Sequence, residues 1–291
     1  NMQRETKGGI FCAVLAAVLY AVNAPFSKQL LRSLPPTLTA GFLYLGAGAG
    51  TILIALIRRI RKTAGRESKL TRAELPYTVA MIVLDIAAPV CLMFGLRSTP
   101  AASAALLNNF EIVATALIAW VVFRERIRVR LWLGILCVTA ACALLSLENL
   151  QGMHFSKGSL LVLLAAVCWG LENNCTRKLS DKDPMEIVLL KGLFSGAGSL
   201  ITGLCIGERV ALWSDVPAAL ALGFVAYGLS IFFYVYAQRK LGAARTSTFY
   251  ALAPFVSVFL SLALFREKPG YAFPAALALM ALGTWLSACE K

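Results

Sequence analysis

Long apolar blocks are the feature of this sequence that most restricts its fold. An α-helix needs about 20 apolar residues to cross the roughly 30 Å hydrocarbon core of a bilayer. Blocks of this kind predict ten membrane-spanning helices, at residues 8–31, 37–57, 75–97, 100–123, 129–147, 158–179, 184–206, 216–238, 243–265 and 270–288. Since 59% of the 291 residues are hydrophobic and 15% are charged, we expect an all-α integral membrane protein and not a water-soluble globule.

Basic residues are distributed unevenly around these predicted spans. Ten spans place both termini on one side, and assigning that side to the cytoplasm puts about 20 Lys and Arg residues in cytoplasmic segments and about 7 outside. The densest block is RRIRKTAGRESKLTR at 58–72. Topology and contact with anionic lipid therefore explain the net charge of +13, and no nucleic-acid partner is expected. The prediction is a multi-pass protein of the cell inner membrane with cytoplasmic termini and an external His154.

An internal repeat divides the chain into two halves. Three pairs of segments match: AAVLYAVNAPFSKQL at 16–30 with AAVCWGLENNCTRKL at 165–179, GAG at 46–48 with GAG at 196–198, and FRER at 123–126 with FREK at 265–268. The sequence thus predicts two five-helix repeats, residues 1–150 and 151–291. Because five is odd, the second repeat enters the membrane from the opposite face. Inverted repeats are typical of secondary transporters that work by alternating access.

These features together resemble the drug/metabolite transporter superfamily, and specifically its EamA-like members. The resemblance lies in the span count, the duplication, the aromatic followed by polar residues in spans one and six, and the Phe-Arg-Glu ends of spans four and nine. It implies a central cavity lined mainly by spans 1, 3, 4, 6, 8 and 9, with spans 5 and 10 at the periphery. It does not name a substrate, since relatives handle amino acids, amines, nucleobases and sugars. Many relatives have a proline where this chain has Glu111 and Ile112, so the resemblance assigns no role to Glu111.

Three acidic residues lie deep within predicted spans: Asp85, Glu111 and Glu172. An ionised acid at the bilayer centre costs roughly 2.5–3.5 kcal/mol on insertion scales, so such residues normally face a cavity or a polar partner. On a continuous helix, Asn108 and Glu111 share one face. The sequence admits two roles for Glu111, either binding of substrate or a proton, or an interhelical hydrogen bond or ion pair with a base such as Lys191.

The other buried charges are also open to two interpretations. Asp85 and Glu172 suit a functional and a structural role equally. Under the repeat, Tyr227 takes the position of Asp85 and Asn23 takes that of Glu172. Lys191 either extends to the cytoplasmic interface or neutralises one of the acids, or it contacts a ligand.

Aromatic residues on the expected cavity-lining spans complete the candidate site. Aromatic rings with carboxylates recognise ammonium groups through cation–π attraction and charge, although aromatic residues also serve as ordinary packing. The predicted substrate-binding or proton-coupling residues are Glu111, Asp85, Glu172, Asn108, Asn109, Asn23, Tyr20, Trp169, Tyr227, Tyr234 and Tyr250.

The sequence offers little for catalysis. Its one histidine, His154, lies in the predicted external loop, its eight cysteines form no C-x-x-C pair, and GAGAG at 46–50 lacks the Lys-Ser/Thr of a P-loop. We therefore expect no enzyme, no metal, no cofactor and no ATP-driven step. The predicted function is secondary active transport of small polar metabolites, with amino acids or amines favoured, coupled to protons or driven by exchange. The alternatives are an importer of a cationic nutrient such as choline, and a passive channel or membrane scaffold.

Overall fold

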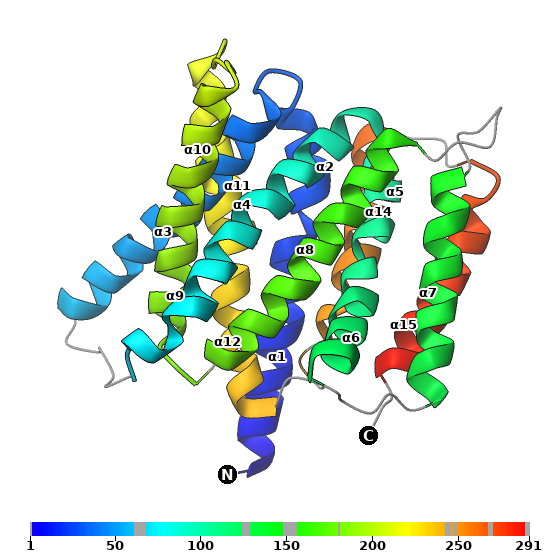
Figure 1. Ribbon diagram of the computed structural model, residues 1–291, viewed down its shortest axis with the longest axis horizontal. Coiled ribbons are helices and arrows are strands. Elements are labelled where there is room, and N and C mark those ends of the chain that lie inside the picture. The colour runs from blue at the N-terminus through cyan, green and yellow to red at the C-terminus, as the bar shows by residue number, and fades with distance from the viewer. Residues whose placement is uncertain are drawn as a thin grey trace.

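The protein, described from a computed structural model, is a bundle of helices (Figure 1). The structure describes residues 2–60, 68–123, 129–147, 156–179, 181–241, 246, 249–266 and 270–288. Among these residues there is no strand, so the prediction of an all-α protein is confirmed. The α-helices are α1 (Met2–Ala21), α2 (Asn23–Leu30), α3 (Pro36–Ile60), α4 (Leu75–Ser98), α5 (Ala101–Asn108), α6 (Phe110–Phe123), α7 (Val129–Leu147), α8 (Lys157–Leu179), α9 (Pro184–Leu190), α10 (Gly196–Cys205), α11 (Val216–Gly223), α12 (Ser230–Leu241), α14 (Ala253–Phe265) and α15 (Phe273–Ala288).

Four short elements of other helix types join or extend these helices. Two are 3₁₀ turns, η1 (Arg72–Glu74) and η3 (Trp213–Asp215), which lead into α4 and α11. The other two are π-helical turns, η2 (Lys191–Ser195) and η4 (Phe224–Leu229). Each π-helical turn lies inside a longer helical segment, between α9 and α10 or between α11 and α12.

Seven helical segments of the described chain are long and apolar enough to cross a membrane: Lys7–Leu30, Pro36–Ile57, Arg72–Ser98, Ala101–Ile118, Lys157–Leu179, Pro184–Cys205 and Trp213–Ala237. Three shorter apolar helices, Trp132–Leu144, Ala253–Phe265 and Phe273–Leu286, fall in the fifth, ninth and tenth predicted spans. The start of the predicted ninth span, His154 and residues 61–67 of the basic loop at 58–72 lie outside the described residues.

Several predicted spans are interrupted near their middle. The first breaks at Val22, between α1 and α2, and the fourth breaks at Asn109, between α5 and α6. A turn at Ala251 and Leu252 precedes α14 in the ninth, and the seventh and eighth contain η2 and η4. The assumption of a continuous helix that put Asn108 and Glu111 on one face does not hold across Asn109, because apolar composition and periodicity do not report where backbone hydrogen bonds change partners.

Helices that are distant in sequence pack against one another throughout the bundle. At its centre α4 packs along α8, while α1 packs along α12 and α5 contacts α14. At one end α7 and α15 pair with each other, and at the other α3 packs against α10 and α11 (Figure 1). The N-terminal end of α1 and the C-terminal end of α15 lie at the same edge of the bundle (Figure 1).

Glycine lets α3 approach α11 closely. A Cβ atom added at Gly46 would lie 2.0 Å from the carbonyl oxygen of Leu220, and one added at Gly223 would lie 1.9 Å from that of Leu43. Small residues at helix contacts are a common means of close packing in membranes, where apolar side chains gain little from leaving lipid. The GAGAG run therefore contributes to tight packing of α3.

Candidate functional site

Three acidic side chains and a lysine line a cavity inside the bundle. We call it the charged cavity; it is lined by Tyr20, Tyr44, Asp85, Glu111, Trp169, Glu172, Asn173, Thr176, Lys191, Tyr227, Ile231, Tyr234, Val235 and Tyr250. The volume of the cavity is about 80 Å³, which is more than a single buried water molecule requires. Six of its fourteen lining residues are aromatic and three are acidic, so the cavity combines rings with negative charge.

Lys191 is the centre of a buried cluster of charges. Its Nζ lies 2.5 Å from Glu172 Oε1, to which it donates a hydrogen bond, and 3.2 Å from Asp85 Oδ2. Asp85 accepts a second contact at its other oxygen, since Tyr44 OH donates to Oδ1 over 2.8 Å, and Thr176 Oγ1 donates to Glu172. The side chains of the three charged residues are at most 5% exposed. The interpretation in which Lys191 extends to an interface was therefore wrong, because two acids hold its ammonium group inside the protein.

Glu111 has a different kind of partner. It lies in the first turn of α6, and its Oε1 accepts a hydrogen bond from Asn173 Nδ2 of α8 over 2.5 Å. Among the described residues it forms no ion pair with Lys191 or another base, whereas the interhelical hydrogen bond that the sequence also admitted is present, between α6 and α8. Thr115 lies one turn after Glu111 on α6, but it does not add a polar group to the face of Glu111, because its hydroxyl donates to the backbone carbonyl of Glu111. The carboxylate of Glu111 is thus held in place by a neutral amide.

Tyrosine rings form a connected row in the charged cavity. The ring centroids are 4.9 Å apart for Tyr44 and Tyr227, 6.0 Å for Tyr227 and Tyr20, 5.8 Å for Tyr20 and Tyr250, and 4.8 Å for Tyr250 and Tyr234. Spacings of this size are typical of favourable aromatic pairs. The row runs past both Asp85, bonded to Tyr44, and the side of the cavity where Glu111 lies.

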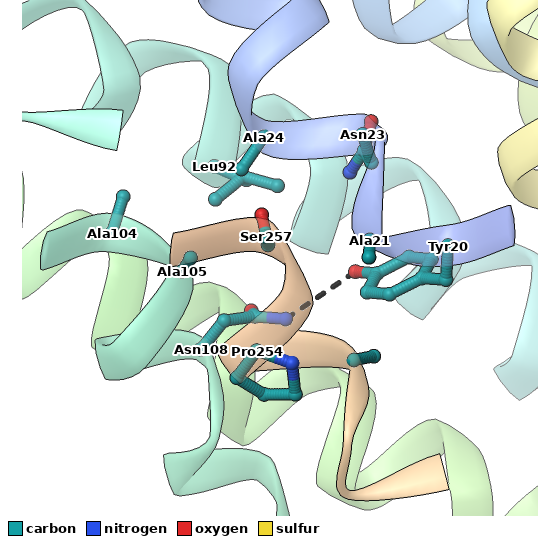
Figure 2. Close-up of a pocket in the computed structure, with 11 residues that line it drawn as sticks. Tyr20, Ala21, Asn23, Ala24, Leu92, Ala104, Ala105, Asn108, Pro254 and Ser257 are labelled. Carbon is teal, nitrogen blue, oxygen red and sulfur yellow. Dashed lines mark hydrogen bonds between the residues drawn. The ribbon is translucent and has the colours of Figure 1, made fainter. Parts of the chain in front are cut away.

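A second, smaller pocket shares Tyr20 with the charged cavity, and Figure 2 shows this second pocket. We call it the small pocket; it is lined by Tyr20, Ala21, Asn23, Ala24, Leu92, Ala104, Ala105, Asn108, Ala253, Pro254 and Ser257. Asn108 Nδ2 donates a hydrogen bond to Tyr20 OH over 3.3 Å (Figure 2). Because Tyr20 lines both spaces, its ring is part of the wall between them.

The two spaces occupy opposite halves of the bundle. The small pocket takes its lining from α2 and α5, whereas the charged cavity takes residues from α6 and α12. The helices α6 and α12 lie toward the edge that holds the N-terminus, and α2 and α5 lie toward the opposite edge (Figure 1). The break at Asn109 therefore coincides with the passage of span four from one space to the other.

Most of the predicted site residues lie around these two spaces. The charged cavity holds Tyr20, Asp85, Glu111, Trp169, Glu172, Tyr227, Tyr234 and Tyr250. Asn23 and Asn108 line the small pocket, and Asn23 Nδ2 donates to Tyr227 OH over 2.9 Å. Asn109 lines neither, because its Nδ2 donates to Thr284 Oγ1 of α15 over 2.9 Å.

Comparison with known proteins identifies the family. The model of the EamA-like transporter family matches residues 7–147 and again residues 156–289. The chain belongs to the EamA-like transporter family. Because this is a family of transporters, the prediction that the chain is not an enzyme is confirmed.

Curated relatives of this EamA-like transporter match most of its length. An uncharacterized transporter of Methanothermobacter thermautotrophicus is 24% identical over 276 residues, which cover 89% of this chain and 80% of the relative. The uncharacterized transporter YvbV of Bacillus subtilis is 26% identical over 272 residues, covering 91% and 86%. A probable amino-acid metabolite efflux pump of Salmonella typhimurium is 24% identical over 247 residues, covering 81% and 79%.

A solved crystal structure shares the fold of the EamA-like transporter. It superposes with a TM-score of 0.71 over 96% of this chain and 95% of that one, at 20% identity. At this identity the likeness concerns the fold alone. Together with the apolar helices, the family places the protein in a membrane as a multi-pass protein.

Some cavity residues of the EamA-like transporter were not among the predicted site residues. Asn173 and Thr176 follow Glu172 by one and four positions, so their neighbourhood in sequence was an available signal. Tyr44 gave no such signal, because it lies in an apolar stretch of a span that the resemblance did not place at the cavity. Among the described residues, no group of three histidine, cysteine or acidic side chains is arranged to hold a metal ion.

Proposed function

We propose that this EamA-like protein is a secondary active transporter of small polar metabolites, with amino acids or amines favoured as substrates. The observation that carries the proposal is the charged cavity, in which Glu111, Asp85 and Glu172 lie between membrane-spanning helices. Ionisable residues within membrane-spanning segments are costly and usually mark the path of a substrate or ion. Aromatic rings beside carboxylates suit a ligand with a positively charged nitrogen.

The name of one relative supports the same substrate class. The Salmonella protein is named as a probable amino-acid metabolite efflux pump, and we extend to this chain the general class of amino acids and related amines. The direction of transport is a separate matter, since the charged cavity suits export of such a metabolite and import of a cationic nutrient such as choline alike.

We further propose that residues 1–150 and 151–291 are inverted repeats that exchange roles during transport. The family model matches once in each half. The packing of α4 (span three) on α8 (span six) has its counterpart in α12 (span eight) on α1 (span one). The break at Asn109 corresponds to the turn at Ala251 under the same offset that aligns Arg97 with Arg239. Broken helices near the midplane are a recurring feature of inverted-repeat transporters.

Glu111 is the group that we propose to couple transport to protons. Glu111 is half-buried, and a carboxylate inside a membrane protein without a cation as partner is unfavourable, so it needs a proton or a positively charged substrate to neutralise it. The two would then compete for one site as the cavity opens to either face in turn. Exchange of one substrate molecule for another would use the same site without net proton movement.

Proteoliposomes test this function directly. We expect saturable counterflow of a labelled amine or amino acid, and a change in accumulation when the pH gradient is collapsed at fixed membrane potential. Flux that does not saturate and shows no counterflow would identify a channel. If neither flux nor ligand-dependent stabilisation occurs with any compound of a broad screen, a scaffold is the better description. Accumulation that is independent of the pH gradient would replace proton coupling by exchange or another ion.

The orientation that we propose has cytoplasmic termini in the cell inner membrane and an external His154. Its support is the excess of basic residues in segments on the side of the termini. In a Cys205→Ser background, which removes an exposed cysteine at the end of α10, His154→Cys should react with an impermeant thiol reagent in intact cells. Gly65→Cys should react only after permeabilisation. The reverse pattern would invert the topology.

A further inference from the structure

The ammonium group of Lys191 is already neutralised within the charged cavity. Its distances of 2.5 Å to Glu172 and 3.2 Å to Asp85 give it two carboxylates as partners. Both acids are themselves fixed, Asp85 by Tyr44 and Glu172 by Thr176. Lys191 is also the one basic residue in the lining of the cavity, as far as the structure describes it. A ligand carboxylate that entered would find no available cation there.

The charge of Glu111 is in the opposite situation. Its hydrogen-bond partner is the neutral amide of Asn173, and the part of the chain that the structure describes gives it no ion pair. A carboxylate oriented in this way offers its remaining acceptor capacity to a donor in the cavity. Counting formal charges, the lining holds three acids against one lysine, so the cavity favours a ligand that brings positive charge.

The row of tyrosines supplies a second means of binding such a ligand. The ring of Tyr250 contacts those of Tyr20 and Tyr234, and all three residues line the same cavity as Glu111. The face of an aromatic ring attracts ammonium and repels carboxylate, because the ring quadrupole is negative at its face. Charge and rings therefore select the same type of ligand.

From this arrangement we propose that the substrate is an organic ammonium cation without a carboxylate, with its nitrogen at Glu111 and Asn173 and its body along the tyrosines. This inference rests on the proposed function, and it narrows the substrates from amino acids or amines to amines. Asp85 and Glu172 act as specificity-determining positioning residues, because they occupy Lys191 and so deny it to the carboxylate of an α-amino acid.

Matched compounds test the inference on the unmodified protein. Each amine is compared with the amino acid from which decarboxylation derives it: phenethylamine with phenylalanine, agmatine with arginine, putrescine with ornithine. In thermal-shift and counterflow-competition measurements, at least one amine should act at concentrations about tenfold or more below those of its amino acid. The amide of that amino acid, which keeps the size of the carboxyl group but not its charge, should act like the amine. An amide as weak as the acid would show that shape excludes the acid, and would overturn the inference.

The possible failures are distinguishable. If amino acids equal or exceed their amines, the inference is wrong while the proposed transport function stands. If no compound of either series binds, competes or is transported in a broad screen, the proposed function itself fails.

Substitutions extend the test to the residues that carry the inference. Asp85→Asn combined with Glu172→Gln releases the ammonium of Lys191, so the preference for amine over amino acid should fall by about tenfold or more. Asn173→Ala should weaken amine binding, whereas Asn174→Ala should not, because Asn174 Nδ2 donates to the backbone oxygens of Gly170 and Thr115. If the double variant does not fold, the matched compounds and the two asparagine variants still test whether the cavity prefers an amine to the amino acid and where the amine binds. Equal effects of the two asparagine variants on amine binding would contradict the assigned position of the ligand.

Discussion

The charged cavity and the small pocket share Tyr20 but differ in chemistry. The first is lined by three acids, a lysine and a row of aromatic rings. The second is lined mainly by alanine and other small or apolar side chains, with Asn23, Asn108 and Ser257 as its polar members. In the part of the chain described, Asn108 Oδ1 and Ser257 Oγ are buried and lack hydrogen-bond partners. In the charged cavity Asp85 Oδ2 also lacks a hydrogen bond, but it lies 3.2 Å from the ammonium group of Lys191. The charged cavity therefore pairs its charges with one another, whereas the small pocket holds only neutral polar groups.

The charges of the charged cavity come from both halves of the sequence and are not repeated at the equivalent positions. Under the repeat, the positions of Glu111 and Lys191 are Ala253 and Gly41, and that of Asp85 is Tyr227. The scaffold therefore does not itself require the charges. Of these equivalents, Ala253 lines the small pocket and Tyr227 lines the charged cavity. The charges therefore stand at positions where the other repeat has a small or neutral residue, which points to function as the reason for the charge.

Lys191→Met should have the largest effect. It leaves Asp85 and Glu172 buried without their cation, and breaking a buried ion pair typically costs about 3–5 kcal/mol. We expect a large loss of folded protein, measured by fluorescence-detected gel filtration after heating. Adding Asp85→Asn and Glu172→Gln to this variant should recover much of the stability, because the cluster is then neutral. If Lys191→Met alone is as stable as the parent, the cluster is not what fixes the charged cavity.

Glu111→Gln should affect transport more than stability. The amide keeps the volume and can still contact Asn173, but it removes the charge and the exchangeable proton. We expect folded yield near the parental level and active transport below about one tenth of the parental rate, with partial activity in Glu111→Asp. A Gln variant that accumulates substrate normally would move the functional site to Asp85 or Glu172. A Gln variant that misfolds would make Glu111 a structural partner.

Tyr20→Ala should remove part of the wall between the two spaces. A side chain that separates two pockets limits leak, so its removal should lower the accumulation ratio to about half while downhill flux persists. Tyr20→Phe is the matched control, because it keeps the ring and loses only the hydrogen bond from Asn108. An equal loss of accumulation in the two variants in proteoliposomes would show that the hydroxyl, and not the ring, forms the barrier.

Ser257→Ala should have the smallest effect. The hydroxyl lines the small pocket and is buried without a partner, so its removal exposes no new unsatisfied group. We expect a change in the free energy of unfolding within about 0.5 kcal/mol and an unchanged transport rate. A clear loss of transport would mean that the small pocket also binds substrate, and the contrast between the two spaces would then be weaker than we infer.

Much of this arrangement could be predicted from sequence, for identifiable reasons. Apolar blocks locate helices because crossing hydrocarbon imposes both length and composition. The cost of burying Asp85, Glu111 and Glu172 marks them as partners of something polar. The pairing within the cluster could not be predicted, since composition does not say which acid meets Lys191.

The directions in which neighbouring side chains point also could not be predicted from the sequence. Asn108 and Asn109 are adjacent, and successive residues of a helix point about 100° apart, so one faces Tyr20 while the other contacts Thr284. Only the rotation of the helix, set by its packing, determines which does which. Tyr44 illustrates the same limit, because its place beside Asp85 depends on how α3 meets α4.

The π-helical turns make the lining of the charged cavity sensitive to the number of residues in two of its helices. Lys191 opens η2 and Tyr227 lies within η4, and such a turn holds one residue more than the α-helical turn that it replaces. Deleting a single residue from either turn would restore a regular helix without rotating the flanking segments by a full residue, because the wider turn has already absorbed the extra residue, and only side chains within the turn would change direction. Lys191 could then leave its two acids, or Tyr227 its ring neighbours, without any change in the identity of a lining residue. In this protein the deletion of one codon, without any amino-acid substitution, is enough to change which side chains the cavity presents.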